Sequence, residues 1–197
     1  YEIVSRDWSS DVCSSDLCSG DQALRRLWAV GLGTLAFSME DILLEPFGGE
    51  ILGLTVAQTT YLTAILAAGG LSGFAWASHV LSRGADPFRM ACRGAWVGIP
   101  AFAAVIISAP QASATLFSLG VFFIGYGAGL FGHGTLTATM NSAPSGEAGL
   151  ALGAWGAVQA STAGLAMALG GILRDVAAQW FESATAYSLV YSLEDRK

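Results

Sequence analysis

Residues 94–146 read GAWVGIPAFAAVIISAPQASATLFSLGVFFIGYGAGLFGHGTLTATMNSAPSG and contain no Asp, Glu, Lys or Arg. Two further runs without these charged residues cover 51–82 and 148–173. A bilayer core about 30 Å thick needs roughly 20 apolar residues for each spanning helix. The runs are long enough for several such helices, so the sequence predicts an all-α integral membrane protein.

The composition of the whole chain argues against several other classes of protein. Of its 197 residues, 53% are hydrophobic and only 12% are charged, whereas soluble domains carry about 25% charged residues. The net charge of -6 argues against a nucleic-acid partner, because binding to phosphates needs clustered Lys and Arg. The sequence has no P-loop, HExxH, GxSxG or dinucleotide fingerprint, and its three cysteines lack the spacing of metal ligands. We therefore expect no catalytic residues and no metal site.

Charges and helix-breaking residues divide the chain into segments. Residues 1–20 contain a tandem five-residue repeat, SSDVC followed by SSDLC, and no apolar periodicity. We expect these residues to be a non-native or disordered leader. Residues 21–197 are expected to form a membrane helical domain with about five full spans and part of a sixth. The spans are predicted at 24–44, 56–81, 87–108, 112–139 and 148–173, and the partial one at 183–191.

Arginines in short loops predict the orientation of these spans, because cytoplasmic loops are enriched in Lys and Arg. Arg25 and Arg26 precede the first span, and Arg83, Arg89 and Arg93 lie between the second and the third. Both segments are expected on the cytoplasmic side. The second of them also contains Asp86, which could form ion pairs that link neighbouring helices, although a topology signal alone would explain the arginines.

Four carboxylates lie at the outer end of the first span, in the stretch EDILLEPFGGE. Ionisable groups inside a membrane are costly and often mark functional sites. Glu40 and Asp41 are expected either to face a protein interior or to reach interfacial water, whereas interfacial water is the favoured position for Glu45 and Glu50.

The fourth span contains a histidine in an unusual setting. Gly129 and Gly125 precede His133 at intervals of four residues, so one stripe of the helix is almost bare except for the imidazole. Such a stripe could admit a neighbouring helix, which is the commoner outcome. It could instead admit a planar tetrapyrrole whose central Mg takes the imidazole nitrogen as an axial ligand, as haem iron does. In the fifth span, Gly and Ala recur from Gly149 to Ala168, and this face is expected to pack tightly.

Several motifs carry a resemblance to known membrane proteins. The loop SRGADPFRMACR at 82–93 is similar to a degenerate form of the loop motif of the major facilitator superfamily, whose two halves are related repeats of six helices. The stretch FSMEDILLEPFGGEILGLTVAQTTYLT at 37–63 closely resembles the PucC-type bacteriochlorophyll-delivery family, a branch of that superfamily. The similarity continues through GLFGHGTLTATM and GLALGAWGAVQASTAGLAMALGGILRD and covers about residues 21–191.

This resemblance implies the C-terminal half of a multi-pass protein in the inner or intracytoplasmic photosynthetic membrane of a bacterium. The implied function is the assembly of light-harvesting complexes, with bacteriochlorophyll or a precursor as the ligand. Implied partners are the lipid bilayer, the N-terminal half of the same protein, and light-harvesting polypeptides or pigment-synthesis enzymes. The alternatives are a secondary transporter of a small solute and a structural membrane subunit without a ligand. Proton-coupled transport would favour carboxylates near the bilayer midplane, and the middle thirds of the second to fifth spans contain none.

Overall fold

The computed structural model describes residues 24–39, 44, 48–49, 52–108, 110–111, 113–143 and 146–194. Within these residues every regular element is an α-helix, which confirms the predicted all-α class. The expected leader at 1–20 lies outside the described residues, and so do Glu40, Asp41, Glu45 and Glu50.

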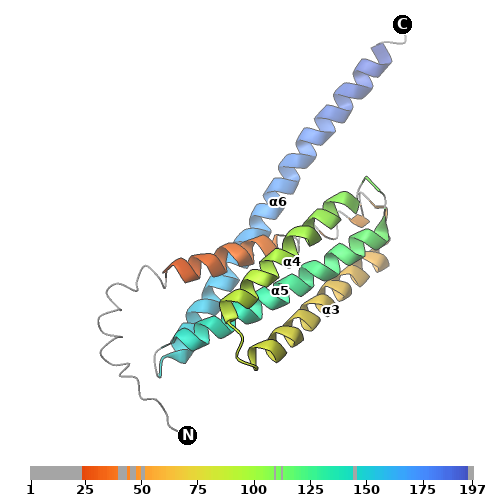
Figure 1. Ribbon diagram of the computed structural model, residues 1–197. Helices are drawn as coiled ribbons and strands as arrows, with labels where there is room; N and C mark the ends of the chain where they lie inside the picture. The colour runs from red at the N-terminus through yellow and green to blue at the C-terminus, as the bar shows by residue number, and fades with distance from the viewer. Residues whose placement is uncertain are drawn as a thin grey trace.

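Five helical segments make up most of the described chain (Figure 1). The first covers 24–38, and it is followed by α3 (Val56–Leu81), α4 (Pro87–Ser108), α5 (Ala114–Ser142) and α6 (Ala148–Glu194). Four stretches are long and apolar enough to cross a membrane: α3, α4, α5 and the Ala148–Leu173 part of α6. The described residues therefore have the character of a multi-pass membrane protein.

Local hydrogen bonds explain where three of these helices begin. At α3, Thr55 and Gln58 form a reciprocal capping box, in which each side chain accepts a bond from the other residue's backbone N–H. At α4, the Asp86 carboxylate accepts a 2.9 Å bond from the Phe88 N–H, and Pro87 occupies the first helical position, where no N–H is needed. Ser113 caps α5 by accepting from Leu116.

Glycines bring α3 and α5 into direct backbone contact. A Cβ atom added to Gly69 or Gly73 of α3 would clash with the carbonyl oxygen of Phe122 or Tyr126. On the opposite side, a Cβ atom on Gly125 would clash with the carbonyl oxygen of Leu66. Small residues permit this close approach, which is a common basis of helix association in membranes.

The other side of α5 packs against α4 by the same means, so α5 lies between α3 and α4 (Figure 1). A Cβ atom on Gly94 would lie 2.6 Å from the carbonyl oxygen of Gly127, and one on Gly127 would lie 2.8 Å from that of Gly94. A Cβ atom on Gly134 would lie 2.7 Å from the Ala91 nitrogen. Helix α5 is therefore the centre of a three-helix layer.

Helix α6 differs from the prediction. The sequence predicts a loop at about 174–182 and a separate partial span at 183–191, but the structure has one continuous helix from Ala148 to Glu194. The prediction was wrong because it relied on charge and hydropathy, which mark where a helix leaves the membrane and not where it ends. No Gly or Pro interrupts residues 172–194, so nothing in that stretch breaks the helix.

The glycine face of α6 is also more open than expected. Cβ atoms added to Gly149, Gly153, Gly156 or Gly164 would meet no atom of the described residues within 4 Å. The tight packing that the spacing predicts for this face is instead found on α3, α4 and α5. Within the described chain, α6 extends well beyond the three-helix layer (Figure 1).

The close contact between α3 and α5 can be tested by adding one methyl group. Gly125→Ala should destabilise the full-length protein by about 1–3 kcal/mol, because the new Cβ atom forces the two backbones apart. Gly164→Ala is the matched control, since its Cβ atom enters open space. Thermal denaturation in detergent should show a lower midpoint only for Gly125→Ala. Equal midpoints for the two variants would contradict the packing described here.

Candidate functional site

The predicted slot beside His133 is occupied by α3. A Cβ atom on Gly129 would clash with the carbonyl oxygen of Gly70, and Gly125 faces Leu66 in the same way. Of the two outcomes that the sequence left open for this stripe, the structure therefore shows helix packing. The α3 backbone fills this stripe at Gly125 and Gly129.

The His133 ring itself lies against an aromatic side chain of α3. Its centroid is 4.2 Å from that of Phe74, in an edge arrangement. The Nδ1 atom of His133 is buried and has no hydrogen-bond partner among the described residues. A histidine that ligates a metal usually donates its other ring N–H to a carboxylate, carbonyl or water, which orients the ring. That orienting bond is missing from the described surroundings of His133.

The arginine-rich segment 82–93, which covers the turn after α3 and the start of α4, contains a local ion pair. Arg89 Nε lies 3.6 Å from Asp86 Oδ2, and the two side chains are 83% and 48% exposed. Exposed pairs of this kind contribute about 0–1 kcal/mol to stability. Arg83 and Arg93 form no ion pair with any carboxylate that the structure describes. The loop therefore does not link helices through charge within this part of the chain.

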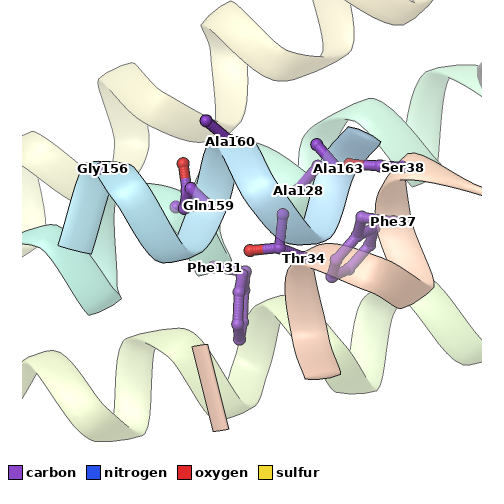
Figure 2. A pocket seen from close by; sticks show the side chains of 10 residues that line it. Thr34, Phe37, Ser38, Ala128, Phe131, Gly156, Gln159, Ala160 and Ala163 are labelled. Carbon is purple, nitrogen blue, oxygen red and sulfur yellow. The ribbon is translucent and has the colours of Figure 1, made fainter. Parts of the chain in front are cut away.

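A cavity of about 390 Å³ lies between the 24–38 helix, α5 and α6 (Figure 2). Its polar side chains are those of Thr34, Ser38 and Gln159. The rings of Phe37 and Phe131 form aromatic walls, with their centroids 5.8 Å apart. The remaining lining residues are small, namely Ala128, Gly132, Gly156, Ala160 and Ala163.

The cavity lies near the middle of the membrane spans. Ala128 is the central residue of α5, and Gln159 lies close to the centre of Ala148–Leu173. Thr34 is nine residues beyond Arg25, which corresponds to roughly 14 Å along a helix, or about half of the bilayer core. We refer to this space as the midplane cavity.

The hydroxyl group of Thr34 has no hydrogen-bond partner among the described residues, although the residue is only 8% exposed. Other threonines in these helices, including Thr60, Thr139 and Thr162, donate to a carbonyl oxygen four residues earlier. An unpaired hydroxyl group in an apolar interior is unfavourable. Rotation about χ1 would exchange the positions of the hydroxyl and the methyl group, which allows Thr34 to donate to a molecule in the cavity.

The chemistry of the midplane cavity suits a neutral ligand that is mostly apolar. Its volume falls within the usual range of small-molecule sites, which combine apolar walls with a few polar groups. None of the described residues that line it is ionisable. The hydroxyl and amide groups can instead hydrogen-bond to a carbonyl group, while the two phenylalanine rings contact a flat apolar surface.

Sequence reasoning missed this cavity. The available signal was the presence of uncharged polar residues, Thr34 and Gln159, at the centres of two predicted spans. That signal could not show which helices meet, because Gly, Ala, Ser and Thr are abundant throughout the spans.

Comparisons with known proteins identify the family. The family model described as PUCC protein matches residues 8–195, which is nearly the whole chain. The chain belongs to the PucC protein family. This result confirms the resemblance inferred from the motifs at 37–63, 129–140 and 149–175.

Named relatives support the same assignment. Protein PucC of Rhodovulum sulfidophilum is 56% identical over 177 residues, which cover 90% of this chain and 39% of that protein. Protein PucC of Cereibacter sphaeroides is 55% identical over 161 residues, which cover 82% and 35% of the two chains. A more distant relative, at 25% identity over 191 residues, is the bacteriochlorophyll synthase 44.5 kDa chain of Rhodobacter capsulatus, where the match covers 88% of this chain and 44% of the relative.

The chain thus spans about two fifths of the length of these relatives. No solved structure matches the chain significantly. The PucC relatives come from photosynthetic bacteria, which gives the membrane protein a photosynthetic context.

The unpaired nitrogen of His133 leads to a prediction about stability. Leaving a buried polar atom without a partner costs about 1–3 kcal/mol, and Leu would remove that atom while still packing against Phe74. We expect His133→Leu in the full-length protein to have a thermal midpoint equal to or above that of the parent. His79→Leu, at the exposed end of α3, is the control for a general effect of losing a histidine. A clearly lower midpoint for His133→Leu alone would show that the imidazole makes a stabilising interaction.

Proposed function

We propose that this chain is part of a membrane protein that binds bacteriochlorophyll or a precursor and serves the assembly of light-harvesting complexes. The observation that carries the proposal is the match to the PucC family over residues 8–195. One relative is named as a chain of bacteriochlorophyll synthase, which supports a connection with this pigment. We propose a binding and delivery role, and not catalysis by this chain.

The midplane cavity supports the pigment as the ligand. Bacteriochlorophyll is a flat, largely apolar ring that bears carbonyl groups at its edge. Phe37 and Phe131 offer aromatic surfaces to such a ring, and Thr34 and Gln159 offer hydrogen-bond donors to its carbonyl groups. A volume of about 390 Å³ accommodates one edge of the ring, while the rest would extend past the small residues of α6.

The same cavity argues against proton-coupled transport of a solute. Intramembrane proton relays use ionisable side chains such as Asp, Glu and His. The part of the midplane cavity lining that the structure describes contains only uncharged groups. A neutral pigment needs no charged partner, so the cavity fits pigment binding better than ion-coupled transport.

The remaining elements of the proposal concern partners and location. The lipid bilayer surrounds the spans, and the longer protein would supply the other helices of the complete bundle. Light-harvesting polypeptides or pigment-synthesis enzymes are the proposed protein partners. The proposed location is the inner or intracytoplasmic photosynthetic membrane of the bacterium.

The test is to purify the full-length protein from a pigment-producing host and to measure pigment absorbance per protein. Gly156→Phe should lower the bound pigment at least fivefold, because the ring enters the midplane cavity. Gly153→Phe is the matched control, since Gly153 lies on the same helix with open space at its Cβ atom but outside the cavity lining. It should retain the parental absorbance.

A second pair of variants tests the hydrogen bond. Thr34→Val keeps the shape of the side chain and removes the hydroxyl group, so we expect less pigment and a shifted absorption band. Thr60→Val, whose hydroxyl group donates to the Val56 carbonyl oxygen on α3, should leave both unchanged. A parent protein that is colourless, or a Gly156→Phe variant with undiminished pigment, would contradict pigment binding at this cavity.

A further inference from the structure

A second cavity, of about 360 Å³, opens at one end of the helix bundle. It lies between the start of the 24–38 helix, the start of α4 and the end of α5, and its lining includes Arg25, Phe88 and Thr139. We refer to it as the end cavity. It is separate from the midplane cavity except for Phe131, whose side chain forms part of both linings.

The end cavity has a positively charged edge. Arg25 and Arg26 both line it and both are exposed. The guanidinium carbon of Arg26 lies 5.3 Å from the centroid of the Phe88 ring, so a cation–π contact holds this charge beside the opening. Neither arginine is paired with a carboxylate among the described residues. The edge is therefore available to an anionic group.

The interior of the end cavity is apolar, although it contains two threonines. The Thr135 hydroxyl group donates to the Phe131 carbonyl oxygen at 2.9 Å and accepts a 3.3 Å bond from the Trp155 indole N–H. The Thr139 hydroxyl group donates to the Thr135 carbonyl oxygen at 2.9 Å. Because these polar groups are already hydrogen-bonded, the interior offers mainly the alkyl and aromatic surfaces of Val30, Ala91, Ala95, Phe131 and Ala138.

The cavity extends along the helices and not across them. Thr139 lies close to the end of α5, and Phe131 is eight residues deeper, which corresponds to about 12 Å along the helix. Phe131 closes the inner end, and Gly33 leaves room for its ring, since a Cβ atom on Gly33 would clash with it. The site therefore combines a cationic edge with an apolar interior.

We propose that the end cavity binds an anionic phospholipid of the adjoining leaflet. The phosphate group pairs with Arg25 and Arg26, and part of an acyl chain enters the apolar interior as far as Phe131. Basic pockets between membrane helices are a recurrent type of binding site for anionic lipid headgroups. If the two arginines served only as a topology signal, no cavity beside them would be needed.

The experiment uses the purified, delipidated full-length protein and measures lipid binding by native mass spectrometry and by thermal denaturation. Phosphatidylglycerol should bind and raise the melting midpoint of the parent, whereas phosphatidylcholine of the same chain length should have a much smaller effect. Replacing both arginines, with Arg25→Gln and Arg26→Gln, should weaken phosphatidylglycerol binding by roughly tenfold or more, because each arginine near the surface contributes substantially to attraction.

Ala95→Trp tests the apolar interior without changing charge, because Ala95 is exposed and lines the cavity. It should weaken binding to a similar extent. Arg83→Gln and Ala68→Trp are the matched controls outside the cavity lining, and they should bind phosphatidylglycerol as the parent does.

Three results would overturn this proposal. The first is equal binding of phosphatidylcholine, and the second is unchanged binding by both the double arginine variant and Ala95→Trp. The third is equal protection by inorganic phosphate, which would show a headgroup anion site without an acyl chain. None of these results depends on bound pigment, so the lipid proposal can fail while the pigment proposal stands.

Discussion

Backbone contact between α5 and its two neighbours determines how α3, α4 and α5 are arranged, and both cavities form beside these helices. Carbonyl oxygens of α3 and α4 lie where side chains of α5 would otherwise be, because Gly125, Gly127, Gly129 and Gly134 have none. In a bilayer the hydrophobic effect does not drive helices together, and close packing of small residues takes its place. This contact makes α3, α4 and α5 one rigid layer.

Both cavities lie on the side of this layer where packing is looser. The 24–38 helix and α6 contact α5 through larger side chains: Phe37 packs against Phe131, and Trp155 donates to Thr135. Larger side chains keep backbones apart and leave spaces between them. A rigid layer can therefore hold Phe131 and Thr135 in fixed positions while the spaces beside them remain open to ligands.

Much of the architecture was predictable from the sequence, and the reason is physical. Charged residues are costly in the bilayer core, and Pro suits the first helical position, so the bounds of α3 and α4 coincide with the ranges expected from residues such as Asp86 and Pro87. Pro100 lies inside α4 and does not end it. The family was also predictable, because the motif at 37–63 is unusual. By contrast, the continuous α6 was not predictable, since a helix can cross the membrane surface without any change in its own hydrogen bonds.

The midplane cavity was less predictable, because a stripe of small residues does not show which helix, if any, packs against it. The same spacing packs tightly at Gly125 and lies open at Gly156. His133 is the chemically distinctive residue of its span, yet the residue that both lines a cavity and has a buried, unpaired hydroxyl group is Thr34.

Pigment binding in the midplane cavity can be tested by locating the ring itself. Cryo-electron microscopy of the pigment-loaded full-length protein should show ring density between the 24–38 helix, α5 and α6, with a carbonyl group within hydrogen-bond distance of Thr34 or Gln159. Pigment density on another face, with this cavity empty, would contradict it.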